Sequence, residues 1–419
     1  MTYNIAVVGL GYVGAPLWHA LSQHFPTVGY DLNSSRVEEL NRGVDTTGEL
    51  SESSLISSKS LFATDNLSDI KNCNVYILTV PTPINNHKKP DLSFLKFACS
   101  SIGELLDKDD LVIFESTVYP GCTEEVCIPI LEQYSKLAHL FDFNVGYSPE
   151  RINPGDKTHR LSTVTKVISA DSVAALSKVA SIYEKIVSAG LYKAANIRTA
   201  EAAKIIENTQ RDVNIALINE LAMLFEKLEI DTQDVLEAAA TKWNFLPFKP
   251  GLVGGHCIGV DPYYLAHKAE SVGFEPKMIL SGRYTNEKVV DFIIEKVRSE
   301  CKSQSLDDEF KILIMGATFK ENVPDFRNSK AIEIAKKLSE DSFCVYVHDP
   351  FHHLAERKFR DLHMIDDMAL HKYNLIIIAV GHDQYSKIPL DNIKNLLKPN
   401  GKIYDLKGIY PKDRQTYRL

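Results

Sequence analysis

Short apolar segments alternate with amphipathic ones over the first half of the chain. The apolar segments are rich in Val, Ile, Leu and aromatic residues, which is typical of strands buried on both faces of a sheet. We expect strands at 4–9, 27–31, 74–80, 110–115, 144–148 and 165–169, and helices at 14–23, 34–41, 92–106 and 121–134. Because strands that alternate with helices form a parallel sheet with both faces covered, this half predicts a doubly wound α/β domain.

The middle of the chain has a different pattern. Residues 199–228 contain neither Pro nor Gly, and their apolar residues recur about every 3.6 positions, which predicts one long helix. The apolar positions of this helix are Ile205, Ile206, Val213, Ala216, Leu217, Leu221, Leu224 and Phe225. Further helices are expected at 232–240 and 280–301, with a loop rich in Pro and Gly at 246–262.

Strands and helices alternate again from residue 311 onward. The expected strands are 311–316, 344–348, 375–380 and 402–405, and the expected helix is 330–339. The sequence therefore predicts an α/β fold with two Rossmann-like, doubly wound parallel-sheet domains joined by a central helical region. We place the domains at 1–198, 199–305 and 306–419, and we expect the central region to form the interface of a homodimer.

Composition restricts the classes of partner and the compartment. The chain has 419 residues and a formal net charge of −8, which argues against nucleic acid or an anionic membrane as the main partner. No apolar run approaches the roughly 20 residues of a membrane helix, and no basic and then apolar leader precedes the first strand. Seven cysteines without a C-x-x-C pair indicate a reducing compartment. We therefore expect a cytoplasmic, multi-domain enzyme.

A glycine motif follows the first predicted strand. Gly9, Gly11 and Gly14 form G-x-G-x-x-G, in which the glycines allow a tight turn, a close approach of a diphosphate and close helix–strand packing. Asp31 ends the next strand, where its carboxylate can bind ribose hydroxyls and repel a 2′-phosphate, so the pair favours NAD over NADP. Arg36 is either a residue that stacks on the adenine or a solvated helix arginine.

Two threonines follow other predicted strand ends. Thr82 lies in V-P-T-P at 80–83, and Thr117 lies in E-S-T-V-Y-P-G at 115–121. In open α/β sheets, ligands bind outside the carboxyl ends of the strands, so both threonines are candidates for contact with cofactor or substrate. Ordinary turn chemistry explains them equally well.

Two polar residues share one face of the long helix. Lys204 and Asn208 are four positions apart, and such a pair can hold an oxyanion or position a water. Spacing alone favours a solvated helix face for this pair.

The loop at 249–262 carries the candidate nucleophile. Glycines flank Cys257, and Asp261 follows four residues later. A loop cysteine near Lys204 could have a lowered pKa and attack an electrophile. His256 is a weaker candidate for a general base, because packing or backbone bonding is the commoner role of such a histidine.

Lys320 and Arg327 flank a predicted strand-to-helix turn in the last domain. Phosphates are often held at such turns, so these cations favour a phosphate site over ordinary surface charge. The adjacent His352 and His353 have no company that could complete a metal site, and we expect no metal.

Seven motifs occur in one order between Gly9 and Ser329. They are G-L-G-Y-V-G, V-P-T-P, S-T-V-x-P-G, S-P-E, A-K-x-x-E-N, G-G-x-C-x-x-x-D and G-x-x-F-K-x-x-x-x-D-x-R-x-S. Over essentially the whole chain, this series resembles the UDP-glucose/GDP-mannose 6-dehydrogenase family. The segments 149–156, 207–220 and 254–264 look like the branch that acts on UDP-N-acetylhexosamines and feeds the synthesis of surface polysaccharides.

The resemblance implies a four-electron oxidation of the sugar C6 with NAD as oxidant. Cys257 would form a thiohemiacetal and then a thioester, which water releases as the uronic acid. The catalytic residues implied are Cys257, Lys204, Asn208, Asp261, Thr117 and Glu150. The implied cofactor contacts are Gly9, Gly11, Tyr12, Val13, Gly14, Asp31, Arg36, Thr82, Thr117 and Arg327. The implied substrate contacts are Glu150, Arg151, Lys204, Asn208, Arg211, Gly254, Gly255 and Lys320.

Two positions depart from the UDP-glucose members that this chain resembles. Those members carry a second acid where this chain has Pro154, and a lysine where it has Val260. We therefore expect a UDP-N-acetylhexosamine 6-dehydrogenase, with UDP-GlcNAc ahead of UDP-GalNAc. The alternatives are a UDP-glucose 6-dehydrogenase, a two-electron hydroxyacid-type dehydrogenase, and a non-catalytic sensor that binds a UDP-sugar.

Overall fold

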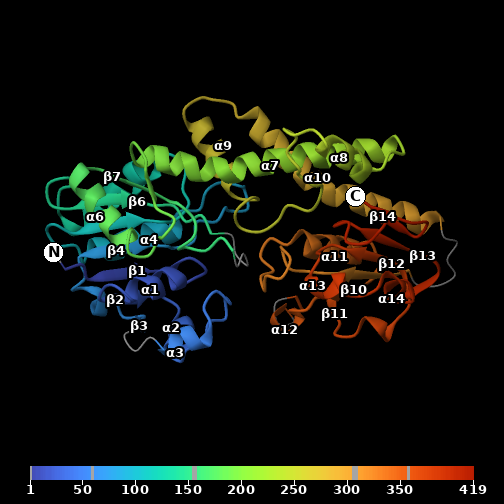
Figure 1. The fold of residues 1–419 in the computed structure, drawn as a ribbon, viewed down its shortest axis with the longest axis horizontal. Helices are drawn as coiled ribbons and strands as arrows, with labels where there is room; N and C mark the ends of the chain where they lie inside the picture. Colours follow the sequence, from blue (N-terminus) through green and yellow to red (C-terminus); the bar gives the residue numbers. More distant parts are fainter. Residues whose placement is uncertain (1, 58–60, 153–157, 304–309, 356–358) are drawn as a thin grey trace. The chain divides into compact units, whose positions relative to one another are not determined.

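The computed structural model describes residues 2–57, 61–152, 158–303, 310–355 and 359–419. The chain forms two compact units, and each contains one sheet (Figure 1). The first unit consists of Met1–Glu207 and Tyr263–Glu275, and the second consists of Asn208–Pro262 and Pro276–Leu419. The expected division at residues 198 and 305 stays a prediction. Among the described residues, no helix is both long and apolar enough to cross a membrane.

An eight-stranded sheet in the order β3-β2-β1-β4-β5-β6-β7-β8 forms the first unit. The strands are β1 (Ile5–Val8), β2 (Thr27–Tyr30), β3 (Phe62–Thr64), β4 (Val75–Leu78), β5 (Leu111–Phe114), β6 (Asn144–Tyr147), β7 (Lys166–Ala170) and β8 (Leu191–Lys193). The helices are α1 (Gly14–Ser22), α2 (Ser34–Asn41), α3 (Glu52–Ser57), α4 (Ser93–Gly103), α5 (Ile128–Ser135) and α6 (Val173–Tyr183), with short turns at Leu67–Ile70 and Thr123–Cys127. Every residue of β1, β4 and β5 is buried, as the apolar runs predicted.

One strand pair of this sheet departs from the expected parallel order. All neighbouring strands are parallel except β6 and β7, which run antiparallel. No helix lies between β6 and β7 in the described sequence, and a parallel partner needs a long crossover connection. The prediction of a doubly wound parallel sheet is confirmed apart from this pair.

A six-stranded parallel sheet in the order β11-β10-β9-β12-β13-β14 forms the core of the second unit. Its strands are β9 (Lys311–Met315), β10 (Cys344–His348), β11 (His363–Met364), β12 (Tyr373–Ile378), β13 (Leu397–Asp405) and β14 (Thr416–Arg418). Its helices include α8 (Thr232–Ala240), α10 (Lys277–Ser303), α11 (Lys330–Glu340), α12 (His352–Ala355), α13 (Asp383–Ser386) and α14 (Leu390–Lys394), with a short turn at Met368–Leu370. Ile312 and Ile314 pack with α10 and α11, while the alternate residues Leu313 and Met315 pack into a second core on the other face.

Two helices continue from one unit into the other along the sequence. They are α7 (Ile197–Lys227) and α9 (Asp261–Ser271). The long helix predicted at 199–228 is therefore confirmed, whereas α9 begins inside the segment that was expected to be loop. Pro262 stands in the first turn of α9, where its missing N–H costs no hydrogen bond.

The helix expected at 121–134 is confirmed, but its first part is not an ordinary α-helix. The turn Thr123–Cys127 is π-helical, and the N–H of Ile128 donates to the carbonyl of Thr123. Pro129 follows directly and has no N–H to continue an ordinary ladder. The elements α3, α6, β3 and β8 were not predicted. For β3 and β8 the reason is that three-residue strands carry too little periodicity to be distinguished from loop.

A buried polar network holds α7 and α10 together in the second unit. The Arg283 guanidinium donates to the carboxylate of Asp212, and the Asn286 amide donates to the same carboxylate at 2.7 Å. The Asn219 amide donates to Asn286 at 2.8 Å and to the carbonyl of Gly251 at 3.0 Å, and it accepts from the N–H of Gly251 at 2.8 Å. The network therefore links both helices to the loop that carries the candidate nucleophile.

Arg283→Met tests the energetic weight of this network. We expect the substitution to lower the free energy of unfolding by roughly 3–5 kcal/mol, because it leaves the Asp212 carboxylate buried without its cation. Arg298→Met is the matched control, since Arg298 pairs with Asp341 at the surface and its loss should cost under about 1 kcal/mol. Urea unfolding followed by circular dichroism measures both, and equal losses would contradict the expectation.

Candidate active site

The turn after β1 has the steric requirements of a dinucleotide-binding loop. A Cβ atom on Gly14 would lie 1.7 Å from the carbonyl oxygen of Gly9, so only glycine fits there. Gly9 itself has φ of +92°, which L side chains rarely adopt. At Gly11, in contrast, a Cβ would meet nothing within 4 Å, so the backbone is open to a ligand.

The start of α1 is suited to an anion. Tyr12 and Val13 lie between the open Gly11 and the buried Gly14, and Val13 provides no side-chain hydrogen bond to cap the helix. Within this turn the N–H of Ala15 donates to the carbonyl of Gly11 at 3.1 Å, and Pro16 has no N–H. The helix dipole is therefore the feature that favours an anion at this end of α1. The residues of this turn fit the diphosphate of NAD.

Asp31 and Arg36 both bind the backbone of this turn. The Asp31 carboxylate follows β2 and accepts from the N–H of Leu10 at 2.7 Å, which leaves lone pairs for ribose hydroxyls. Arg36 donates to the carbonyl of Leu10 at 2.9 Å and pairs with Asp45 at 2.7 Å. Arg36 is buried, so the solvated-helix interpretation is wrong, and its contact with adenine stays a prediction.

Hydrogen bonds join the strand-end loops of the first sheet. The Thr79 hydroxyl donates to the carbonyl of Gly9, the Ser116 hydroxyl to that of Val80, and the Thr82 hydroxyl to that of Thr117, each at 2.6 Å. The structure thus brings the glycine turn and both predicted threonines to the carboxyl edge of β1, β4 and β5. This is the edge at which open α/β sheets bind ligands.

Glu150 lies at the end of the next strand along the sheet. Its carboxylate accepts from the N–H groups of Arg151 and Ile152, both at 2.7 Å, and pairs with Lys166 at 3.1 Å. Lys166 pairs with Glu115 at the same distance, and burial raises the pKa of Glu115 to about 7. Glu115 and Lys166 were missed in the sequence analysis. Glu115 directly follows the apolar strand β5 and Lys166 is the first residue of β7, and a buried charge is unexpected at either position. Pro154, one of the two departures noted above, lies outside the described residues.

The substrate candidates on and near α7 differ in their surroundings. Arg151 pairs with Glu207 at 2.9 Å, and Arg211 is half-buried. Lys204 is 8% exposed, so the solvated helix face that spacing favoured is wrong. Among the residues that the structure describes, no acceptor is hydrogen-bonded to the Lys204 amine. An ammonium without an acceptor is suited to hold an oxyanion.

Asn208 and Asp261 meet in the second unit. The Asn208 amide donates to the Asp261 carboxylate at 2.5 Å, and both residues are buried. The N–H groups of Val260 and Asp261 donate to the carbonyl of Cys257 at 3.0 and 2.9 Å, which closes the loop into a tight turn. Cys257 is half-buried and forms no disulfide. The structure therefore brings the predicted Asn208 and Asp261 together, next to the turn that contains the candidate nucleophile Cys257.

The glycines before Cys257 pack against a loop that lies some 70 residues later in the sequence. A Cβ on Gly254 would lie 2.5 Å from the carbonyl oxygen of Asn328, and one on Gly255 would lie 2.6 Å from the ring of Phe319. The His256 ring packs edge-on against Phe319 and lies 3.8 Å from the carboxylate of Asp325. Its orientation matches the packing role that we considered the commoner one.

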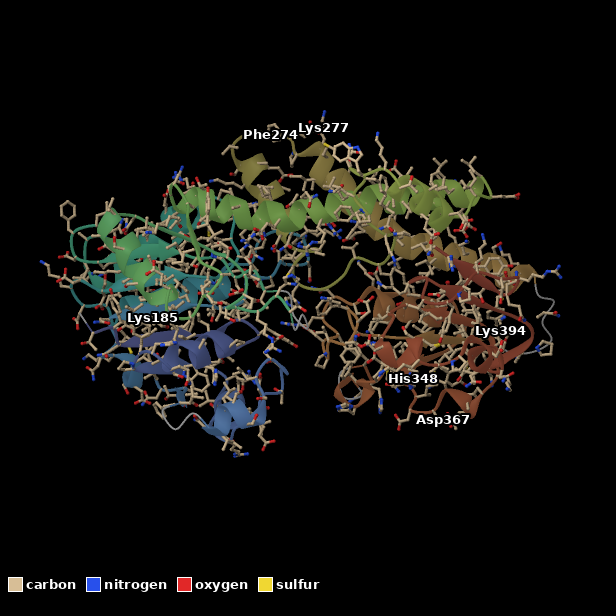
Figure 2. All side chains as sticks on the ribbon, in the orientation of Figure 1. Lys185, Phe274, Lys277, His348, Asp367 and Lys394 are labelled. Carbon is tan, nitrogen blue, oxygen red and sulfur yellow. The ribbon has the colours of Figure 1, made fainter. Side chains whose placement is uncertain are left out.

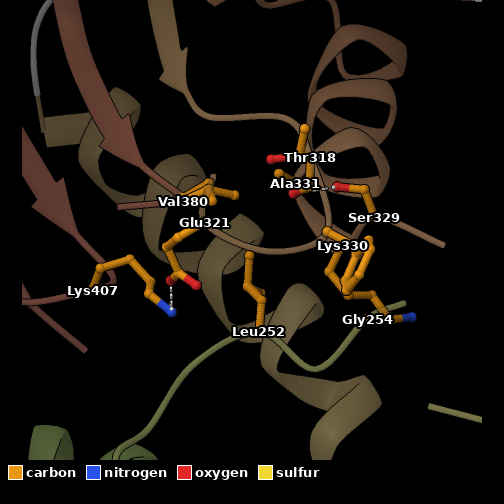
Figure 3. A pocket seen from close by; sticks show the side chains of 11 residues that line it. Leu252, Gly254, Thr318, Glu321, Ser329, Lys330, Ala331, Val380 and Lys407 are labelled. Carbon is orange, nitrogen blue, oxygen red and sulfur yellow. Dashed lines mark hydrogen bonds and ion pairs between the residues drawn. The ribbon is translucent and has the colours of Figure 1, made fainter. Parts of the chain in front are cut away.

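The two cations predicted to contact phosphate, Lys320 and Arg327, and a small pocket all lie in the second unit. The Arg327 guanidinium is bound to the carboxylate of Asp325, while Lys320 is half-buried. The pocket has a cavity volume of only about 20 Å³, which is room for about one water. It includes neither of these cations but contains two other lysines, Lys330 and Lys407 (Figure 3). It is lined by Leu252, Gly254, Thr318, Phe319, Glu321, Ser329, Lys330, Ala331, Ala379, Val380 and Lys407.

The second sheet lacks an open counterpart of Asp31. Asp349 follows β10, directly after His348 (Figure 2), and accepts from the N–H groups of Ala317 and Thr318 at 2.6 and 3.0 Å. His382 covers the same carboxylate at 3.1 Å, and both side chains are almost completely buried. A ribose cannot reach this acid, so the geometry favours dinucleotide binding at the first sheet.

Sheet order, glycine turn and Asp31 together define an NAD-binding dehydrogenase domain. Three family models match the chain: the NAD binding domain of the UDP-glucose/GDP-mannose dehydrogenase family over residues 3–187, its central domain over 198–288 and its UDP binding domain over 313–412. The chain belongs to the UDP-glucose/GDP-mannose dehydrogenase family. It is an NAD-dependent oxidoreductase.

Relatives and solved structures match over nearly the full length. A UDP-N-acetyl-D-glucosamine 6-dehydrogenase of Pseudomonas aeruginosa is 48% identical, with 99% of each chain covered. Protein CapL of Staphylococcus aureus is 49% identical, with 99% of this chain and 97% of the relative covered. The structure of a UDP-D-ManNAc dehydrogenase from Pyrococcus horikoshii is 30% identical with a TM-score of 0.87, covering 98% of this chain and 96% of the other.

Two glycine substitutions separate folding from cofactor binding. We expect Gly14→Ala to unfold the turn, because its Cβ would collide with the Gly9 carbonyl, and to lower the melting temperature by several degrees. Gly11→Ala should leave the melting temperature unchanged but weaken NAD binding by about tenfold or more, since the added methyl occupies the open backbone face. Calorimetric titration with NAD and thermal unfolding measure both effects. Unchanged NAD affinity in the Gly11 variant would contradict this site.

Proposed function

We propose that this enzyme oxidises C6 of a UDP-N-acetylhexosamine to the carboxylate, with UDP-GlcNAc as the favoured substrate and UDP-GalNAc as the next. The Asn208–Asp261 pair beside the turn of Cys257 is the observation that carries the proposal. It supplies a donor and an acceptor next to the thiol of Cys257, which a two-electron alcohol dehydrogenase does not need. The name of the Pseudomonas aeruginosa relative supports the choice of sugar.

The proposed reaction balances as one alcohol, two NAD and one water giving one carboxylate, two NADH and three protons. In each of two oxidation steps, C6 would lose one hydride, for which NAD bound at the glycine turn would be the acceptor. Between them, the thiol of Cys257 adds across the aldehyde C=O to give a thiohemiacetal. The second oxidation leaves a thioester, and attack by water breaks its C–S bond and restores the thiol.

Each candidate residue is assigned the role that its surroundings support. Lys204 and the Asn208 amide would stabilise the negative charge that develops on the C6 oxygen, since both are donors in buried positions. Asp261 would accept a proton from the attacking water, with Thr117 and Glu150 helping to position that water. Lys320 and Arg327 would act on the nucleotide substrate and cofactor respectively.

The alternatives predict other products. A UDP-glucose 6-dehydrogenase would prefer the sugar without the N-acetyl group, and a hydroxyacid-type dehydrogenase would form one NADH per substrate. A sensor would bind the nucleotide sugar without forming NADH. Sensor function gives no reason to bury Lys204, Asn208 and Asp261, because charged and amide groups are costly to bury.

Cys257→Ser tests the thioester route. The wild-type enzyme should form two NADH per UDP-GlcNAc consumed, measured at 340 nm with UDP-GalNAc and UDP-glucose in parallel. The variant should lose net acid formation by roughly a thousandfold or more, because the nucleophile is removed. Cys344→Ser is the matched control, since Cys344 is also half-buried, forms no disulfide and should be dispensable. One NADH per sugar in the wild type would instead favour the hydroxyacid-type reaction.

We also propose a homodimer formed through α7. Three exposed apolar side chains, Ile206, Leu217 and Leu224, occupy one stripe of this helix, and the exposed Leu228 directly follows its last residue. At 3.6 residues per turn they fall within about 40° of one another. An exposed apolar stripe on a long helix is typical of a helix–helix interface. We further propose that the enzyme is cytoplasmic and acts in surface-polysaccharide synthesis, and that its domain boundaries lie near residues 198 and 305.

Leu217→Glu combined with Leu224→Glu tests the interface. We expect the double variant to sediment as a monomer at micromolar concentration while the wild type sediments as a dimer, because each buried leucine contributes about 1.5–3 kcal/mol to association. Phe141→Glu, which changes an even more exposed apolar residue elsewhere, is the control and should leave the dimer intact. A wild-type monomer, or a dimer that survives the double substitution, would refute the proposal.

A further inference from the structure

An ionic cluster that the reaction scheme does not use lies inside the first unit, directly beside Glu150. The amine of Lys166, the first residue of β7, is 3.1 Å from an oxygen of Glu150 and 3.1 Å from an oxygen of Glu115. It also lies 3.5 Å from the carbonyl of Pro149. The hydroxyl of Tyr183, at the end of α6, donates to the other oxygen of Glu115. The side chains of Lys166, Glu115 and Glu150 are at most 10% exposed.

The cluster carries two carboxylates for one ammonium, so the division of donors decides where negative charge is held. Glu150 receives two backbone N–H donors in addition to Lys166. Glu115 receives a hydroxyl and Lys166 only, and burial raises its pKa to about 7. Glu150 thus has three donors and Glu115 has two, and Glu115, whose pKa burial raises, binds a proton more readily than an exposed glutamate.

Every bond to the Glu150 carboxylate comes from a donor in the described part of the chain. One oxygen is held by the N–H groups of Arg151 and Ile152, and the other by Lys166. The carboxylate is therefore fixed as a hydrogen-bond acceptor, with capacity for one more donor such as a water or a hydroxyl. Removing Lys166 would free one oxygen to rotate and would leave two carboxylates facing each other.

Stability alone does not account for the cluster. Buried ion pairs are often no more stabilising than apolar residues of the same volume, because the charges lose their hydration. Glu115 directly follows β5, Glu150 follows β6, and Lys166 is the first residue of β7. The strand residues next to Glu115 and Lys166 are apolar. The cost of burying these charges therefore falls at the edge of the sheet that carries Thr117 and Glu150.

We infer that Lys166 is a positioning residue, which holds the Glu150 carboxylate as an oriented acceptor for the water that cleaves the thioester, while Glu115 and Tyr183 hold Lys166. This inference depends on the proposed function, because it requires that Glu150 acts in hydrolysis. Hydride transfer should not need Lys166, since both oxidation steps precede the attack of water.

Single-turnover and steady-state kinetics test this separation. In Lys166→Met, we expect the initial burst of two NADH per active site to remain, while steady-state turnover falls by about tenfold or more. The acylated enzyme should accumulate, and intact-protein mass spectrometry would detect the added mass of the acyl UDP-sugar. Lys166→Arg should restore part of the turnover, since a guanidinium can bridge both carboxylates.

Glu150→Gln distinguishes failure of this inference from failure of the proposed function. If the Glu150 variant does not accumulate the thioester, the role of Glu150 in hydrolysis is wrong. If it accumulates the thioester and both Lys166 variants turn over at the wild-type ratio of burst to steady state, the positioning role is wrong. The double variant should be no slower than Glu150→Gln alone, because both changes remove one function.

Two controls address folding. Circular dichroism and NAD affinity establish that each variant keeps the first sheet. Tyr183→Phe removes a donor from Glu115 but none from Glu150, so it should lower turnover by less than Lys166→Met and shift the pH profile, because Glu115 then binds a proton at higher pH. A loss of melting temperature in the Lys166 variants, with burst and turnover reduced equally, would identify a merely structural cluster and overturn the inference.

Discussion

The bond between the Asn219 amide and the backbone of Gly251 is the constraint on which the site of the second unit depends. The segment from 246 to 260 has no helix or strand to hold it, and yet it must present Cys257 in a fixed place. Three contacts replace secondary structure: Asn219 at Gly251, Asn328 at Gly255, and Asn208 at Asp261. Two of the three amides stand on α7, so the loop takes its geometry from that helix.

On the long helix α7, several polar side chains are buried on one face and several apolar side chains are exposed on the other. Lys204, Asn208, Asp212 and Asn219 are buried and share one face of α7, within about 80° at 3.6 residues per turn. Ile206, Leu217 and Leu224 are exposed and lie on the opposite face. The same helix also buries apolar residues, among them Ile205 and Ile218. The exposed apolar stripe is the observation on which the proposed homodimer rests.

The sequence was sufficient for those parts of the structure that local rules determine. Apolar runs locate the central strands, and the spacing of Gly9, Gly11 and Gly14 fixes the turn, because sterics at those positions involve atoms only a few residues apart. Burial of Arg36 and Lys204 could not be predicted, because each stands in a helix whose local pattern fits solvent equally well. The pairing of Lys166 with Glu115 joins residues 51 positions apart, and only the register of the sheet brings them together.

The two sheets show how one strand order gives two functions. The six strands of the second sheet and the first six of the eight in the other have the same order, 3-2-1-4-5-6. In both sheets an acid after the second strand accepts from backbone N–H of the first turn. Asp31 keeps lone pairs free for a ligand, whereas Asp349 is closed by His382. The acid's bond to the turn is thus a requirement of the fold, since it satisfies buried N–H groups in both sheets. What differs is whether a further side chain covers it, so ligand specificity in this architecture is decided by the residues that follow the later strands.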